Sequence, residues 1–126
     1  MKSDIADYGA FKSLSTDGFL EKLEEGYAII DVRRQDEWDL TGVIEGSVKI
    51  TFFDESGQYD AKTFLDAFTK VVTHHKDQPF ILVCAHANRT KSIGEFLGLQ
   101  MGYKHVFELD GGIINGWIDL GYGTVR

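Results

Sequence analysis

The strongest structural signal in the sequence is Phe80-Ile81-Leu82-Val83-Cys84-Ala85-His86-Ala87-Asn88-Arg89-Thr90. Its first four residues are apolar and follow Pro79, a pattern that predicts a strand buried on both faces of a sheet. Arg89 and Thr90 then open a helical apolar pattern that continues at Ile93, Phe96, Leu97 and Met101. Cys84 is therefore expected at the carboxyl end of a buried strand, a few residues before a helix.

This placement favours the reactive form of the thiol. Backbone N–H groups and the positive end of a helix dipole stabilise an anion, and Arg89 adds a permanent positive charge. A cysteine in such surroundings can be a thiolate, which is the nucleophilic form. A lone cysteine at the end of a core strand is often only a small buried hydrophobe. However, Cys-x-x-x-x-Arg-Thr between a strand and a helix has the layout of an anion-binding loop, so Cys84 is the candidate catalytic residue.

Composition and charge restrict the classes of function. The chain has 126 residues, enough for one domain with a core that needs no disulfide. Lys and Arg number 13 against 20 Asp and Glu, a formal net charge of −7, so we expect no nucleic-acid partner. No apolar signal core or run of membrane-spanning length is found, so no membrane partner is expected either. A single cysteine persists as a free thiol most easily in a reducing compartment, which predicts a cytoplasmic location.

The rest of the chain alternates between strand and helix patterns. Residues 1–15 are expected to form a lead-in and a short edge strand, and further strands are expected at 27–32, 48–50 and 104–109. One helix is expected to begin at Ser15-Thr16-Asp17, which supplies the N-cap candidates. Further helices are expected around residues 36–38, after Asp60 as far as Val72, and over 113–120. His74 and His75, at the end of the helix after Asp60, lack neighbouring cysteines or carboxylate clusters and are expected to be solvated rather than metal ligands.

This alternation predicts an α/β layer fold with a mainly parallel sheet. In such folds ligands bind at the carboxyl edge of the strands. Asp31, Cys84 and the turn Asp110-Gly111-Gly112 all follow strand patterns, so we expect the site at that edge with Cys84 at its centre. Asp31 is a charge at the end of a core strand and must find a partner. We expect it to order neighbouring loops through hydrogen bonds rather than to transfer protons.

The sequence resembles the single-domain rhodaneses, a family of sulfurtransferase modules. The resemblance extends from about Phe19 to Tyr122 and rests on three motifs: Ile30-Asp31-Val32-Arg33 followed by Glu37-Trp38, the segment from Cys84 to Thr90, and Gly111-Gly112-Ile113-Ile114-Asn115-Gly116-Trp117. It implies a single rhodanese domain over residues 1–126. The implied fold is a three-layer α/β/α arrangement around a mainly parallel central sheet of about five strands.

The resemblance also implies a mechanism. Cys84 would take a sulfane sulfur from thiosulfate, polysulfide or a persulfide, and would pass it as a persulfide to cyanide, to a cellular thiol or to a sulfur-accepting protein. The implied substrate- and persulfide-binding loop comprises Ala85, His86, Ala87, Asn88, Arg89 and Thr90, with Asp31 and Arg33 in support. No metal or organic cofactor is needed, because the cysteine itself carries the sulfur. Arg89 is expected to brace the loop against an acidic group near Asp31 or Glu37.

Two loop positions depart from the family pattern. Ala85 stands where family loops often have Arg, and Ala87 stands where they often have Gly. Losing a cation beside Cys84 weakens the attraction for doubly charged thiosulfate, although a protonated His86 would restore part of it. Because Ala rather than Gly stands at position 87, we predict that this position does not require a positive φ angle.

Two other classes of function remain open. Phosphatases and arsenate reductases also use a cysteine loop closed by Arg, but their loop usually has five residues between Cys and Arg, whereas four lie between Cys84 and Arg89. A reductase would also normally need a resolving cysteine. A non-catalytic rhodanese-like binding module is the second alternative, although such modules commonly lack the cysteine. Fold alone does not decide among these classes.

Overall fold

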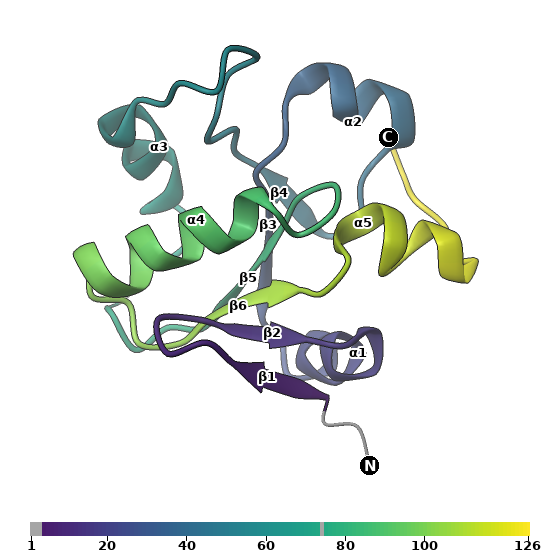
Figure 1. Cartoon of the computed structure of the whole chain (residues 1–126), viewed down its shortest axis with the longest axis horizontal. Coiled ribbons are helices and arrows are strands. Elements are labelled where there is room, and N and C mark those ends of the chain that lie inside the picture. The colour runs from purple at the N-terminus through teal and green to yellow at the C-terminus, as the bar shows by residue number, and fades with distance from the viewer. Residues whose placement is uncertain (1–3, 74) are drawn as a thin grey trace.

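The computed structural model describes residues 4–73 and 75–126 and shows one twisted sheet covered by helices on both faces (Figure 1). The six strands lie in the order β1-β2-β6-β5-β3-β4. Their bounds are β1 Ile5–Asp7, β2 Lys12–Leu14, β3 Ala28–Asp31, β4 Ser47–Lys49, β5 Phe80–Val83 and β6 Val106–Leu109. Strand β1 runs antiparallel to β2 and the other pairings are parallel, which confirms the mainly parallel sheet.

Strand β5 lies at the centre of the sheet between β3 and β6 and is buried throughout. Phe80, Leu82 and Cys84 belong to one core cluster, and Ile81 and Val83 belong to the other. This alternation arises because successive side chains of a strand point to opposite faces. The prediction of a strand buried on both faces, with Cys84 at its end, is confirmed.

Two layers of helices cover the sheet. The α-helices are α1 Thr16–Glu24, α2 Gln35–Thr41, α3 Ala61–Phe68, α4 Arg89–Glu95 and α5 Gly112–Asn115. Helices α3 and α4 supply Phe64, Phe68 and Ile93 to the cluster that contains Cys84, whereas α1 and α5 supply Phe19 and Ile113 to the opposite cluster (Figure 1). The three-layer α/β/α arrangement is therefore as expected. Within the described residues, no helix has both the length and the apolar character needed to span a membrane.

The predicted starts of α1 and α3 are confirmed by their caps. The Ser15 hydroxyl accepts a hydrogen bond from the Gly18 N–H, and the Asp60 carboxylate accepts one from the Thr63 N–H. Each bond satisfies a backbone donor that has no partner within the helix. Helix α3 nevertheless ends at Phe68, earlier than the predicted Val72, so His75 lies well beyond it. His74 lies outside the described residues.

The helix that follows the cysteine loop changes its geometry midway. Helix α4 passes into a π-helical turn, η1, over Phe96–Gln100, rather than continuing as a regular α-helix to Met101 as predicted. A Cβ at Gly94 would collide with the Phe11 ring, and one at Gly98 would collide with the Ala10 backbone. These two glycines therefore let the segment lie directly against the connection between β1 and β2.

The two ends of the chain also differ from expectation. The N-terminal segment forms two strands rather than one, and β1 accounts for the sixth strand of the sheet. The predicted helix over residues 113–120 divides into α5 and a short 3₁₀ turn, η2, over Ile118–Leu120. Trp117 lies between them, packed edge-on against Phe19 with its indole N–H donating to the Gly123 carbonyl 2.8 Å away. The predicted helix is therefore interrupted at Trp117, a residue that packs into the core.

Candidate active site

The predicted site residues follow strands that end at the same edge of the sheet. Asp31 ends β3, Cys84 follows β5 and Asp110 follows β6. The start of α5 is tied to the cysteine loop, because the Ile113 N–H donates to the Cys84 carbonyl at 2.9 Å and the Ile114 N–H donates to the Ala85 carbonyl at 3.0 Å. The structure thus brings these segments together, as the alternation of strands and helices predicted.

The close approach at α5 depends on Gly112. Its φ angle is +65°, and a Cβ there would lie 2.6 Å from the Cys84 carbonyl oxygen and closer still to the Ala85 backbone. Only glycine has no Cβ and adopts this conformation at little cost. Gly112 therefore allows the start of α5 to lie against the backbone of Cys84 and Ala85.

The loop itself contains a residue in the left-handed region. Ala87 has a φ angle of +64°, so the prediction that this position does not require a positive φ is wrong. The chain must reverse direction within the four residues between Cys84 and Arg89, and Ala87 provides the turn. A left-handed alanine costs about 1–2 kcal/mol. Ala87 is buried, and its carbonyl accepts a hydrogen bond from the Lys91 ammonium at 3.0 Å, which holds the turn in place.

Beneath the loop, the thiol begins a chain of hydrogen bonds. The Cys84 thiol donates to the Thr90 hydroxyl oxygen at 3.6 Å, and the Thr90 hydroxyl donates to a Glu108 carboxylate oxygen at 2.6 Å. The second oxygen of Glu108 accepts from the Lys91 ammonium at 2.8 Å. Cys84, Thr90 and Glu108 are at most 1% exposed. The site therefore contains a buried carboxylate two hydrogen bonds away from the sulfur.

Sequence reasoning missed Glu108 and Lys91 as parts of the site. The available signal was a charge inside the apolar strand Val106-Phe107-Glu108-Leu109, since a buried charge must be paired. Its side chain points to the same face as that of Leu82, its register partner on β5. This places it under the first turn of α4, where Thr90 and Lys91 meet it.

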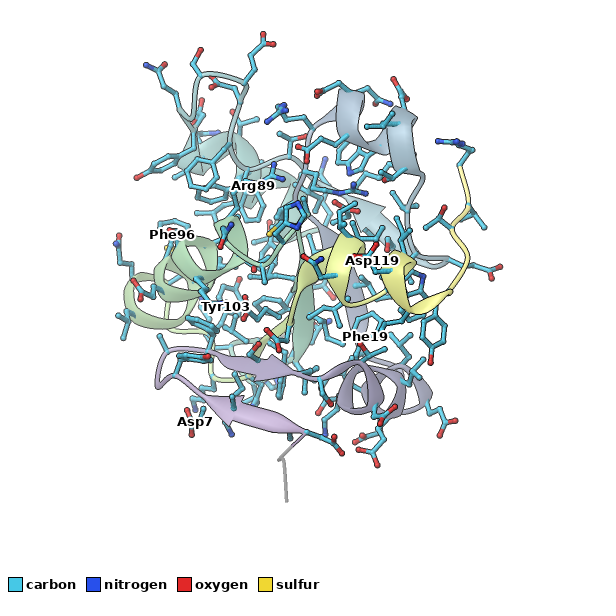
Figure 2. All side chains as sticks on the ribbon, turned by 45° about the vertical axis from the view of Figure 1, so that its right-hand side comes forward. Asp7, Phe19, Arg89, Phe96, Tyr103 and Asp119 are labelled. Carbon is cyan, nitrogen blue, oxygen red and sulfur yellow. The ribbon has the colours of Figure 1, made fainter. Side chains whose placement is uncertain are left out.

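Arg89 braces the loop against α2, as expected. Its guanidinium donates two hydrogen bonds of 2.7 Å to the two carboxylate oxygens of Glu37. Figure 2 shows Arg89 at the end of α4 that lies toward α2. Burial raises the pKa of Glu37, but the hydrogen bonds and charge of Arg89 outweigh burial, so the pKa lies below its usual range. The same hydrogen bonds raise the pKa of Arg89. The charge of Arg89 is thus largely neutralised within the protein.

The Arg89–Glu37 pair predicts a pH-dependent contribution to stability. Because folding lowers the pKa of Glu37 from its ordinary value of 4.5, the stabilisation is complete above that value and is lost as the pH falls through the folded pKa. Glu37→Gln should lower the free energy of unfolding by about 2 kcal/mol at neutral pH. In urea unfolding, this difference between variant and wild type should shrink at acid pH. A difference that stays constant would contradict the assignment.

Asp31 and Arg33 form a buried pair that joins β3 to α2. Two hydrogen bonds of 3.0 and 2.9 Å link the guanidinium to the carboxylate, and the Trp38 indole N–H donates to the same carboxylate at 2.9 Å. Arg33 also donates to the Thr41 hydroxyl and the Gly42 carbonyl. The expectation that Asp31 orders neighbouring loops is confirmed. These hydrogen bonds connect the end of β3 to α2 and so fix the position of α2 next to the site.

An open groove of about 410 Å³ lies beside the cysteine loop. It is lined by Arg34, Phe53, Asp54, Glu55, Gly57, Asn88, Arg89 and Ser92. Arg34 pairs with Asp36 and Glu37, so both arginines of the groove already have carboxylate partners. His86 is exposed, with its Nδ1 2.8 Å from the Asn115 side-chain oxygen. The groove therefore offers a small substrate few uncompensated positive charges.

Comparison with known proteins identifies the class to which this chain belongs. The model of the rhodanese-like domain matches residues 15–119, so the chain is a member of the rhodanese-like family. A rhodanese-related protein from Thermoplasma volcanium has a similar structure, with a TM-score of 0.64 and 26% sequence identity over 90% of this chain and 96% of that chain. Thiosulfate sulfurtransferase from Pseudomonas aeruginosa shares the fold, with a TM-score of 0.64 and 23% identity over 90% of this chain and 21% of that one.

Curated relatives carry a different name. The tRNA uridine(34) hydroxylase of Chlamydia trachomatis serovar D is 29% identical over 121 residues, which cover 91% of this chain and 34% of that protein. The protein of the same name from Chlamydia felis is 29% identical over 98% of this chain and 36% of its own length. The chain thus spans about a third of the length of these relatives.

Proposed function

We propose that this domain is a sulfurtransferase that carries a sulfane sulfur on Cys84 as a persulfide. The observation that carries the proposal is the position of the one cysteine, at the end of the central strand and at the start of a short loop braced by Arg89 and Gly112. Backbone N–H groups of residues 86–89 can turn toward the sulfur in a loop of this length and stabilise a negative charge there.

The proposed reaction has two displacements and needs no external oxidant. The Cys84 thiolate attacks the sulfane sulfur of the donor; a sulfur–sulfur bond forms at Sγ, and the donor's own bond to that sulfur breaks with its electron pair on the leaving group. An acceptor thiolate or cyanide then attacks the outer sulfur, and Cys84 leaves as a thiolate. The proposal is tested by measuring thiocyanate formation from polysulfide and cyanide; no catalysed formation with any sulfane-sulfur donor would contradict it.

The charges of the groove favour a donor other than thiosulfate. Asp54 and Glu55 line the groove, and Arg34 and Arg89 are paired with carboxylates. Ala85 contributes no charge. A doubly charged anion would therefore meet little net attraction, whereas a persulfide carried on a small thiol or a protein needs none. We infer that the natural donor is a thiol-bound persulfide.

Ala85→Arg tests this preference directly. The added cation should raise kcat/KM with thiosulfate about tenfold, because one favourable charge contact near a partly buried site is worth about 1.4 kcal/mol. The rate with a neutral persulfide donor should change less than about twofold, since a neutral donor gains no charge contact. Ala85→Gln is the matched control, because it adds length without charge. Equal changes with both donors would show that charge at this position does not select the substrate.

The relatives named tRNA uridine(34) hydroxylase suggest a second candidate function. In this alternative, the domain contributes its cysteine to a tRNA-modifying enzyme. The net charge of −7 argues against tight binding of RNA by this chain alone. Filter binding with tRNA at low salt tests for direct RNA binding by this domain. We expect no retention of tRNA; salt-sensitive retention would favour the tRNA-modifying function.

A further inference from the structure

The hydrogen bonds beneath Cys84 share a limited number of protons. Thr90 has one hydroxyl proton, and at 2.6 Å that proton lies between its oxygen and the ionised carboxylate of Glu108. The Thr90 oxygen therefore faces Cys84 as an acceptor, and the thiol donates to it. With Thr90 and Glu108 both fully buried, water cannot supply a substitute proton. This arrangement suits the protonated thiol.

The thiolate does not fit the same arrangement. If Cys84 loses its proton while Glu108 keeps its charge, the sulfur anion faces an oxygen lone pair. If Thr90 instead turns its proton toward the sulfur, its oxygen and the Glu108 oxygen become two acceptors 2.6 Å apart with no proton between them. Protonation of Glu108 removes the conflict, because the carboxylic acid then donates to Thr90 and Thr90 donates to the sulfur.

We propose that Glu108 is a positioning residue that sets the protonation state of Cys84 through the hydroxyl of Thr90. Its role in sulfur transfer rests on the proposed function, whereas its effect on the thiol does not. In the resting site Glu108 is ionised and Cys84 is a thiol. When the pH rises and the thiolate forms, the proton of Sγ is released to solvent, and no electrons are exchanged. While Glu108 stays ionised, the sulfur anion faces the lone pair of the Thr90 oxygen and lies two hydrogen bonds from a second negative charge, so loss of the proton is disfavoured.

Lys91 and the other charged groups around Cys84 set the balance between these two states. Lys91 holds the second oxygen of Glu108 and opposes its protonation, which keeps the resting thiol protonated. From the other elements, Arg89 is held by Glu37 on α2, and Asp31 is held by Arg33 after β3. His86 on the loop is hydrogen-bonded with Asn115. Glu108 differs from these groups because hydrogen bonds connect it to the sulfur.

Glu108→Gln provides the test. A flipped glutamine amide accepts from Lys91 with its oxygen and donates to Thr90 with its nitrogen, as protonated Glu108 would. Thr90 is then free to donate to the sulfur, and the like charge is gone. The midpoint of the Cys84 titration should fall by about one pH unit, a tenfold rise in the ratio of thiolate to thiol below the midpoint. The readout is the ultraviolet absorbance of the thiolate, with Cys84→Ser as the blank, and it reports Cys84 alone because the chain has one cysteine.

Controls separate this effect from general loss of charge or structure. Glu95→Gln removes an exposed carboxylate from α4, the helix that carries Thr90 and Lys91, and should leave the midpoint unchanged. In a Thr90→Val background, Glu108→Gln should lose most of its effect, because the connecting hydroxyl is absent. A merely structural role for Glu108 would lower the melting temperature without moving the midpoint.

A second measurement keeps the inference testable if Glu108→Gln does not fold. In the wild type, the carbon NMR signal of the Glu108 carboxyl should shift across the Cys84 midpoint, and in Cys84→Ser it should not. An unchanged midpoint in folded Glu108→Gln, or an unmoved carboxyl signal in the wild type, overturns the inference even if the protein takes up sulfur. A lowered midpoint upholds it even if no sulfur is taken up, so its failure and that of the proposed function are distinguishable.

Discussion

Cys84→Ser should abolish sulfur transfer while leaving the fold intact. A serine hydroxyl does not form a persulfide, so cyanide-dependent thiocyanate formation should fall by at least about a thousandfold, to the uncatalysed rate. Serine is slightly smaller than cysteine, and the nearby Thr90 oxygen can accept its proton, so the free energy of unfolding should change by only about 1 kcal/mol. Thiocyanate assays together with urea unfolding measure both quantities.

A relocated thiol is the matched control for this variant. Thr69 is exposed at the C-terminal end of α3 and does not line the groove beside the cysteine loop. The double variant Cys84→Ser, Thr69→Cys restores one thiol to the protein but places it outside both the loop and the groove. It should remain inactive, because the loop rather than the thiol alone supports the persulfide. Activity in either variant would contradict a role for Cys84.

Arg33→Met should cause the largest loss of stability among single substitutions near the site. Asp31 would keep the Trp38 indole N–H as a donor but would lose the guanidinium that neutralises it, and its carboxylate is fully buried. Removing one partner of a buried ion pair costs about 3–5 kcal/mol, because the other charge is left uncompensated. Urea unfolding at neutral pH should show this loss.

The neighbouring arginine offers the control. Arg34 makes its ion pair with Asp36 at the surface, where the carboxylate is 70% exposed, so Arg34→Met should cost far less stability than Arg33→Met. A loss for Arg33→Met as small as that for Arg34→Met would show that the buried pair does not hold α2 in place. The double change Asp31→Asn, Arg33→Met should restore much of the stability that Arg33→Met loses, because it leaves no unpaired carboxylate. That result would support the charge-based explanation.

Much of the fold was predictable because it depends on local patterns of apolar and capping residues. The apolar run before Cys84 is long enough for a central strand and too short for a helix, and Ser15 and Asp60 mark helix starts through their own side chains. An acidic partner for Arg89 near Asp31 or Glu37 was also foreseen, because a charge beside a buried loop needs a partner, and the structure shows that it is Glu37. The family of the chain followed from three such motifs in order.

The features that were not predictable depend on contacts between distant segments. The left-handed φ of Ala87 is imposed by the reversal between β5 and α4 and held by Lys91, and alanine alone does not reveal it. The π-helical turn contains Gly98, which packs against the backbone of Ala10, a residue far away in the sequence. Glu108 was visible as a charge within a strand, but its partners Thr90 and Lys91 lie on a helix that precedes it.

The most direct test of the account is the mass of the intact protein before and after exposure to a sulfane-sulfur donor. We expect the wild type to gain the mass of one sulfur atom from a polysulfide or a low-molecular-weight persulfide, and to lose it when cyanide is added. Cys84→Ser should gain nothing under the same conditions. If the wild type gains no sulfur from thiosulfate, polysulfide or persulfide, Cys84 does not carry sulfur and the proposed function is wrong.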